Sequence, residues 1–206
     1  MSGIFITFEG IDGVGKSTQA DLLEAYFRER GHDVVRTFEP GGTELGQEIR
    51  QMLLHRKGEV APRAEALLFA ADRAHHVASK IRPALAEGSV VISDRYFDSS
   101  VAYQGAGRAL SMEDVRNISI WATDGLLPHL TVLLDLDAVS ARARRSTTGT
   151  EPDRMEREKI EYFEATRQAF LSLAEAEPDR FFVVDANQSV DAMQAQIRSR
   201  VNQLLG

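Results

Sequence analysis

The sequence predicts an α/β protein with three layers, α/β/α, in which helices cover both faces of a five-stranded parallel sheet. Five short apolar segments, rich in β-branched and aromatic residues, alternate with longer segments that carry apolar residues at helical spacing. Two of the helical segments end at a glycine, Gly31 and Gly88, which is a common residue just past a helix. The chain has 206 residues, so we expect residues 1–206 to form a single domain with a buried core.

The expected strands are short and apolar. Ile4-Phe-Ile-Thr-Phe-Glu9 has the β-branched and aromatic composition of a strand that is buried on both faces of a parallel sheet. Similar segments at residues 34–38, 90–94, 130–136 and 181–185 supply the other four strands.

The expected helices lie between these strands. Residues 16–30 carry an apolar stripe that includes Ala20, Leu23 and Phe27, with the 3.6-residue spacing of an α-helix. Consecutive parallel strands joined by helices require right-handed crossovers. The remaining helices are predicted at residues 44–54, 63–87, 138–146 and 155–177, with one more beginning at Ser111 and one at Ser189.

The composition excludes several classes of protein. A net charge of -7 argues against binding to nucleic acid, which requires clustered excess Lys and Arg. The absence of cysteine removes disulfide scaffolds, thiolate zinc sites and cysteine nucleophiles. No apolar run approaches the ~18 residues of a membrane span, and the N-terminus has no basic region typical of an export signal. We therefore expect a cytoplasmic protein without a membrane partner.

The most informative motif follows the first strand directly. Gly10-Ile11-Asp12-Gly13-Val14-Gly15-Lys16-Ser17-Thr18 satisfies the pattern G-x-x-x-x-G-K-[ST], a P-loop. Glycines let consecutive backbone N–H groups turn toward one phosphate, and the helix that begins near Lys16 directs its positive dipole end there. The Lys16 ammonium reaches the outer phosphates and the Ser17 hydroxyl ligates Mg²⁺. These nine residues predict a site for a nucleoside triphosphate.

A P-loop does not define the reaction. A switch GTPase would need an Asn-Lys-x-Asp motif, but none of Asn117, Asn187 and Asn202 is followed by Lys. The third strand ends in Asp94-Arg95, where a carboxylate beside the P-loop can hold Mg²⁺ or its water shell. From their spacing alone, Asp94 and Arg95 could equally well form an exposed structural ion pair.

Several segments together resemble bacterial thymidylate kinase. They are Glu39-Pro-Gly-Gly-Thr43, the pair Phe69 and Arg73, residues 94–100 running into Ala102-Tyr-Gln-Gly-Ala-Gly-Arg108, and Asp153-Arg154. Their order and their distances from the P-loop match over nearly the whole chain. The resemblance implies a P-loop NTPase fold with a mobile lid, here residues 142–157, usually in a homodimer. It also implies phosphoryl transfer from ATP to dTMP with Mg²⁺.

The resemblance assigns roles to individual residues. Lys16, Asp94, Arg95 and Arg154 would be catalytic, with Arg95 bridging the donor and acceptor phosphates and Ser17 and Asp94 holding the metal. Residues 10–18 and Arg144 would bind ATP. The residues implied for dTMP are Asp12, Glu39, Pro40, Arg50, Phe69, Arg73, Arg95, Ser100, Tyr103 and Gln104. Taken alone, Phe69 would be interpreted as a core residue, and a solvated position on a helix face is an equally good interpretation of Arg50.

The lid assignment depends on position 13. Some members of the family, resembling the eukaryotic type, carry an arginine in the P-loop, whereas this chain has Gly13. The missing cation would then come from the arginines that flank the polar segment 146–153, and Arg154 is the residue we expect over the β- and γ-phosphates.

Two alternatives remain open at this stage. One is a kinase for another deoxynucleoside monophosphate or for a deoxynucleoside, and the other is a non-catalytic nucleotide-binding regulatory protein. No role is predicted for Tyr96 or for the pair His75-His76. Trp121, the only tryptophan, is expected in the core or in a dimer contact.

Overall fold

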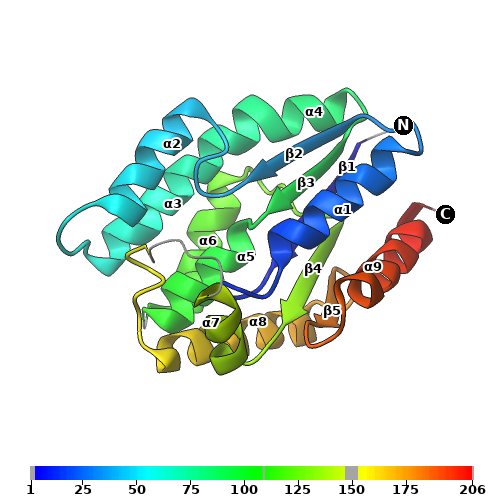
Figure 1. Cartoon of the computed structure of the whole chain (residues 1–206). Helices are drawn as coiled ribbons and strands as arrows, with labels where there is room; N and C mark the ends of the chain where they lie inside the picture. Colours follow the sequence, from blue (N-terminus) through cyan, green and yellow to red (C-terminus); the bar gives the residue numbers. More distant parts are fainter. Residues whose placement is uncertain (1–2, 109, 147–152, 206) are drawn as a thin grey trace.

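The computed structural model of the chain describes residues 3–108, 110–146 and 153–205. Figure 1 shows helices on both faces of a central sheet, which confirms the predicted three-layer fold. The five strands are all parallel and follow the order β2-β3-β1-β4-β5. They are β1 (Ile4–Glu9), β2 (Val34–Phe38), β3 (Val90–Asp94), β4 (Leu130–Asp135) and β5 (Phe181–Asp185).

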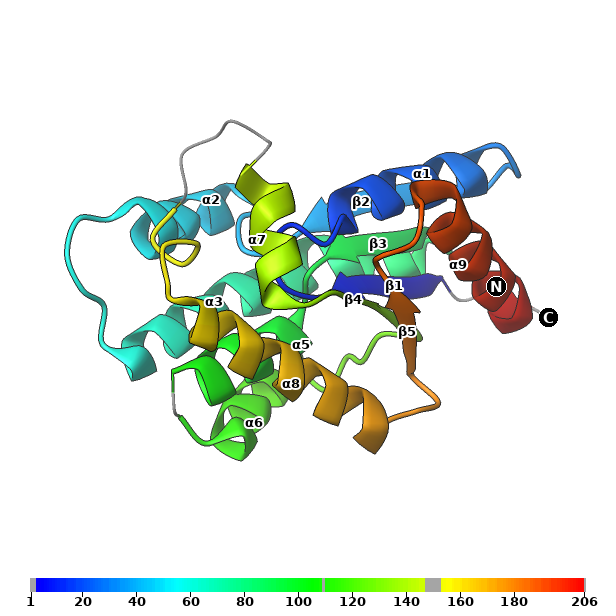
Figure 2. The same ribbon diagram turned by 60° about the horizontal axis from the view of Figure 1, so that its bottom comes forward.

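The helices divide into two layers. In Figure 2, α1 and α9 lie on one face of the sheet, while α5, α6 and α8 lie on the other. The α-helices are α1 (Lys16–Arg28), α2 (Glu44–Arg50), α3 (Pro62–His76), α4 (Arg82–Ala86), α5 (Phe97–Ser100), α6 (Met112–Ala122), α7 (Ala138–Ser146), α8 (Ile160–Ala176) and α9 (Val190–Leu205). Three π-helical turns extend α2, α3 and α5, and they are η1 (Gln51–His55), η2 (Val77–Ile81) and η3 (Val101–Gly107).

The structure differs from the sequence prediction in two places. The sequence analysis assigned no element to residues 97–107, which form α5 and η3. Four residues are too few for a helix to be stable alone, so packing of this segment against α6 and α8 must stabilise it. The predicted helix 155–177 begins only at Ile160, because Asp153 accepts hydrogen bonds from the backbone N–H groups of Met155 and Glu156 in a turn.

The central strands bring the P-loop and α5 to one edge of the sheet. β1 leads into the P-loop, and its neighbour β3 leads into Arg95 and α5. Binding sites of parallel sheets form at the carboxyl ends of the strands, where these two connections meet. Phe5, Ile6 and Phe8 of β1 are fully buried and anchor this edge in the core.

A buried ion pair fixes α5 to the edge of the sheet. Arg180, which directly precedes β5, donates from Nη1 and Nη2 to Asp98 Oδ2 and Oδ1 at 2.6 and 2.9 Å. Asp98 is fully buried, and the Arg180 guanidinium also donates to Thr131 Oγ1 of β4 at 2.7 Å. The pair therefore holds the short helix that follows Arg95. Among the described residues, no helix combines the length and apolar character needed to cross a membrane.

Candidate active site

The P-loop has the backbone geometry that the sequence predicts. Gly10, Gly13 and Gly15 have φ angles of 131°, 90° and 99°, a region that residues with a side chain rarely adopt. The buried Lys16 Nζ donates to the carbonyl oxygens of Gly10 and Ile11 at 3.0 and 2.9 Å. Burial and the nearby Arg95 guanidinium lower the pKa of Lys16.

Gly13 has no room for a side chain. A Cβ atom at this position would lie 2.2 Å from the carbonyl oxygen of Ala141 in α7. The close approach of α7 to the P-loop thus requires glycine here, which gives a steric reason why this chain carries no arginine at position 13.

The candidate metal ligands lie side by side. Ser17 Oγ donates to Asp94 Oδ2 at 2.6 Å, so the hydroxyl at the start of α1 and the carboxylate at the end of β3 face the same point. Both are hard oxygen ligands of the kind that Mg²⁺ prefers, and Mg²⁺ usually keeps several water molecules besides one or two protein ligands. These two residues fit the predicted metal-binding role.

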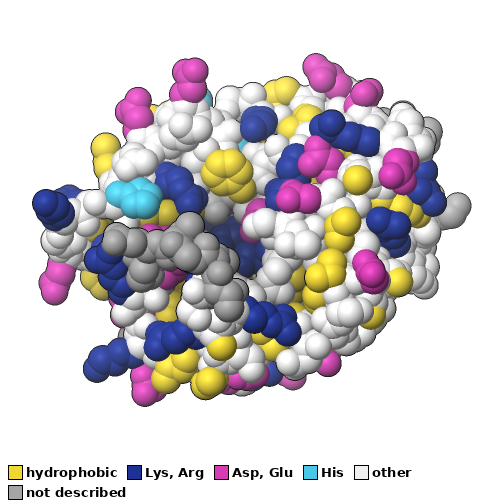
Figure 3. All heavy atoms as spheres, in the orientation of Figure 1, with side chains coloured by type: hydrophobic (Ala, Val, Ile, Leu, Met, Phe, Trp, Pro, Cys, Tyr) yellow, Lys and Arg dark blue, Asp and Glu magenta, His cyan; other side chains and the backbone are white. Residues whose placement is uncertain are grey.

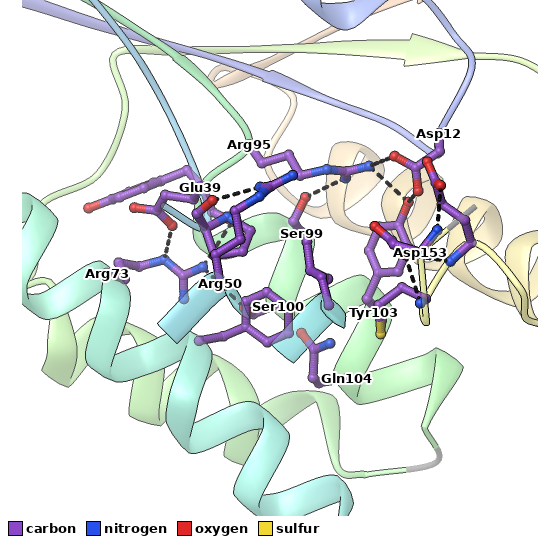
Figure 4. Close-up of a pocket in the computed structure, with 16 residues that line it drawn as sticks. Asp12, Glu39, Arg50, Arg73, Arg95, Ser99, Ser100, Tyr103, Gln104 and Asp153 are labelled. Atoms are coloured by element: carbon purple, nitrogen blue, oxygen red, sulfur yellow. Dashed lines mark hydrogen bonds and ion pairs between the residues drawn. The ribbon is translucent and has the colours of Figure 1, made fainter. Parts of the chain in front are cut away.

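Arg95 lies between the P-loop and α5. Its φ angle of 72° is unusual for a residue with a side chain and turns the chain sharply after β3. The guanidinium donates to Asp12 Oδ1 at 2.5 Å, to Ser99 Oγ at 2.9 Å and to the carbonyl oxygen of Gly10 at 3.1 Å. Figure 4 shows Arg95 extended between Ser99 and Asp12.

The charge of this cluster is fixed by pairing. Burial by itself would raise the pKa of Asp12, but the Arg95 guanidinium and the Lys16 ammonium outweigh it and bring the pKa to about 2. Asp12 is therefore ionised at neutral pH. Glu9, behind Arg95, behaves differently: burial and then the nearby Asp98 carboxylate raise its pKa to about 8.

A cavity of about 150 Å³ opens on the other side of Arg95. It brings together all ten residues predicted for dTMP: Asp12, Glu39, Pro40, Arg50, Phe69, Arg73, Arg95, Ser100, Tyr103 and Gln104. The sequence analysis did not predict the other lining residues, which are Leu54, Tyr96, Ser99, Asp153, Met155 and Glu156.

Arg73 is held rigidly at the base of this cavity (Figure 4). Its Nε donates to Glu39 Oε2 at 2.8 Å, and Nη2 donates to Ser100 Oγ at 3.1 Å and to the carbonyl oxygen of Tyr96 at 3.3 Å. Nη1 donates to Ser119 Oγ at 3.5 Å. Within the described residues these bonds take four of the five N–H groups of a guanidinium, so one N–H of Nη1 is left for a ligand.

A second layer of buried polar residues supports Arg73. His76 Nδ1 lies 2.9 Å from Glu39 Oε1, and His76 Nε2 lies 2.6 Å from Thr37 Oγ1. His76 thus has a structural role that the sequence analysis did not predict. Its position three residues after Arg73, on the same helix face, was the available signal. Burial, and then the Glu39 carboxylate, raise the pKa of nearby Asp72 to about 7.

A second hollow lies over the P-loop and is rich in cations. Lys16, Arg36, Arg50 and Arg95 line it together with Arg144 and Arg145 of α7. Figure 3 shows dark-blue Lys and Arg side chains inside the central hollow of this face. Arg144 Nη1 donates to the carbonyl oxygen of Ala186 at 2.7 Å, and Arg145 donates to both carboxylate oxygens of Glu156 at 2.6 and 2.8 Å.

The structure places Arg154 differently from the expectation. Its guanidinium pairs with the buried Glu65 of α3 and donates to the carbonyl oxygen of Leu53 at 2.8 Å. It lines neither the cavity nor the hollow over the P-loop. The buried carboxylate of Glu65 requires a cation, which explains why Arg154 turns toward α3. Part of the predicted lid, residues 147–152, lies outside the described residues.

The sequence and structure comparisons agree with each other. A family model described as thymidylate kinase matches residues 8–197. A thymidylate kinase from Clavibacter sepedonicus is 59% identical over 205 residues, covering 100% of this chain and 97% of that protein. One from Leifsonia xyli subsp. xyli is 60% identical over 200 residues, covering 97% and 95%. The crystal structure of thymidylate kinase from Ehrlichia chaffeensis superposes with a TM-score of 0.81 at 29% identity, covering 98% of this chain and 99% of that one.

Proposed function

The chain belongs to the thymidylate kinase family, and from this premise we propose how its residues transfer a phosphoryl group from ATP to dTMP. The protein is an ATP-dependent phosphotransferase that makes dTDP and ADP. The observation that carries the proposal is the position of Arg95, which lines both the cavity beside α5 and the hollow over the P-loop. Two nucleotides in these sites would meet, phosphate to phosphate, at its guanidinium.

The donor site is the hollow over the P-loop. The backbone N–H groups of residues 10–18 and the Lys16 ammonium bind the ATP phosphates, and Arg144 lies on the adenine side. Ser17 and Asp94 would hold Mg²⁺, which would neutralise the charge of the phosphates and orient them. The short bond between these two side chains supports this assignment.

The acceptor site is the cavity beside α5. Phe69 stacks on the pyrimidine, the remaining N–H of Arg73 donates to a base carbonyl, and Gln104 contacts the base edge. Ser100 supports Arg73, while Tyr103 lies where a ribose 2′-hydroxyl would project. The part of the cavity wall nearest the dTMP phosphate is formed by Arg50, Glu39, Pro40 and Asp12.

The transfer is an in-line displacement. An oxygen of the dTMP phosphate forms a bond to the γ-phosphorus of ATP as the bond to the β–γ bridging oxygen breaks, and ADP leaves. Positioning and charge neutralisation supply most of the catalysis. Lys16 lies on the donor side of the reacting group, and Arg95 lies between the donor and acceptor sites. We assign the cation of the lid segment 142–157 to Arg145 rather than Arg154, because Arg145 lines the P-loop hollow.

An acceptor panel tests the proposal. Purified protein with ATP and Mg²⁺ is expected to phosphorylate dTMP far faster than AMP or thymidine, because only a pyrimidine monophosphate engages both Arg73 and Arg95. Product formation is followed by chromatography. Equal or faster turnover of unphosphorylated thymidine would contradict the acceptor site, and absence of any turnover would favour a regulatory protein.

We also propose that the enzyme is a cytoplasmic homodimer that pairs through α3 and α6. Trp121 on α6 is 81% exposed and Leu67 on the adjoining α3 is 53% exposed, a costly arrangement for two large apolar side chains. Trp121→Glu is expected to shift the sedimentation coefficient from dimer to monomer, whereas Val190→Glu on the distant α9 should not. A monomeric wild-type protein would contradict the proposal.

A further inference from the structure

Glu65 lies next to the acceptor cavity without lining it, and it binds three side chains from two segments of the chain. Its side chain is 1% exposed. Oε1 accepts from Gln104 Nε2 at 3.1 Å and from Arg108 Nε at 3.2 Å, while Oε2 pairs with Arg154. Gln104 lies in η3, Arg108 directly follows η3, and Arg154 lies in the turn before α8. A buried carboxylate with two arginine partners is well compensated.

This contact fixes the orientation of the Gln104 amide. An ionised carboxylate only accepts hydrogen bonds, so Glu65 must bind the NH₂ group of Gln104 and not its carbonyl oxygen. Because Gln104 lines the cavity, the amide carbonyl oxygen is the atom left to face a bound base. The amide cannot rotate by half a turn without placing its oxygen against a carboxylate.

A fixed carbonyl oxygen distinguishes between pyrimidines. Thymine has an N–H group at N3, which donates to such an oxygen. Cytosine has a lone pair at N3, which the carbonyl oxygen would repel because both atoms are hydrogen-bond acceptors. A site built around one donor–acceptor pattern rejects the opposite pattern strongly, because buried polar groups are left unpaired.

We propose that Glu65 is a positioning residue that selects a base with an N3–H group by holding the Gln104 amide in one orientation. This inference rests on the proposed function, since it takes the cavity beside α5 as the acceptor site. Glu65 does not touch the nucleotide. It acts through Gln104, and its own position is set by Arg108 and Arg154.

The arginines make Glu65 a link between the base pocket and the segment before α8. Arg108 Nη1 donates to Glu158 Oε1 at 2.5 Å, and Arg154 Nε holds the carbonyl oxygen of Leu53 in η1. The positive charges of the two arginines therefore balance the negative charges of Glu65 and Glu158. The family resemblance implies a catalytic role for Arg154; in this structure its guanidinium binds Glu65.

The test is a double-mutant cycle read as selectivity. Glu65→Gln is expected to lower the ratio of kcat/KM for dTMP to that for dCMP about tenfold, because a glutamine can accept from or donate to either face of the Gln104 amide. The KM for ATP should stay within about twofold. Gln104→Ala should lower the same ratio about tenfold, and adding Glu65→Gln to Gln104→Ala should lower it no further.

Controls separate positioning from folding. Glu175→Gln makes the same chemical change at an exposed position of α8 and should leave the ratio unchanged. Glu65→Asp keeps the charge for the arginines but withdraws the carboxylate by one methylene, so it should also lower the ratio even if Glu65→Gln fails to fold.

Three outcomes would overturn the inference. A Glu65→Gln or Glu65→Asp enzyme with wild-type selectivity and only a lower Tm would show a merely structural role. A further loss of selectivity when Glu65→Gln is added to Gln104→Ala would show that Glu65 acts by another route. If Gln104→Ala alone changes neither the KM for dTMP nor the ratio, the acceptor site itself is misassigned and the inference falls with it.

Discussion

Arg95→Met is expected to lower kcat about 10³-fold, because it removes the cation between the two phosphate sites. The guanidinium also holds Asp12, Ser99 and the carbonyl oxygen of Gly10, so its loss frees the P-loop side of the cavity. The transition state spreads negative charge over the transferred group, and a fixed cation there stabilises it more than it stabilises the bound substrates. Steady-state kinetics with both substrates saturating measures the change.

The separate changes in kcat and in the KM for dTMP distinguish a catalytic role of Arg95 from a role in binding. Arg95→Lys retains the charge but loses the planar fork, so it should recover only part of the lost rate. Arg63→Met, an exposed arginine on α3, is the matched control and should keep the wild-type rate. If Arg95→Met changes the KM for dTMP but leaves kcat within about tenfold, Arg95 binds the acceptor without assisting the transfer.

Arg180→Met is expected to destabilise the protein by about 3–5 kcal/mol, because it leaves Asp98 buried without its cation. Asp98 is fully buried and receives two hydrogen bonds from this guanidinium, at 2.6 and 2.9 Å. Since Asp98 belongs to α5, which follows Arg95, the KM for dTMP should rise as well. Urea unfolding, with the slope m checked for constancy, gives the change in free energy.

A second substitution tests the cause. Asp98→Asn in the Arg180→Met background removes the unpaired charge, so the double variant should be more stable than Arg180→Met alone. An Arg180→Met protein that loses less than about 1 kcal/mol would mean that water or another cation compensates Asp98. A double variant no more stable than Arg180→Met would exclude buried charge as the cause.

Local patterns were sufficient to predict the fold. Strands buried on both faces are continuous apolar runs, as in β1 and β3. The bounds of β1, β2, β3 and β5 are those that the sequence predicts. The segment 97–107 escaped prediction because its helical turns depend on packing against α6 and α8 rather than on an apolar period. Propensity alone cannot anticipate that kind of stabilisation.

The site was predictable where a motif fixes its own geometry. The P-loop folds as it does because glycines at positive φ and a following helix define it locally. The partners of buried charges were not predictable, because they lie far apart in sequence. Arg154 follows Asp153 in a pattern that suggested a phosphate contact, yet Glu65, 89 positions earlier, binds its guanidinium. The contact between His76 and Glu39 also joins residues that are far apart in sequence.

Binding of a joined nucleotide tests the central arrangement most directly. In a molecule that links adenosine and thymidine through five phosphates, both nucleosides can enter their sites only if the two sites meet at Arg95. Isothermal titration calorimetry is expected to show binding at least about 100-fold tighter than that of either ATP or dTMP, with most of the gain lost in Arg95→Met. An affinity no better than that of ATP alone, or a gain that survives Arg95→Met unchanged, would contradict the account.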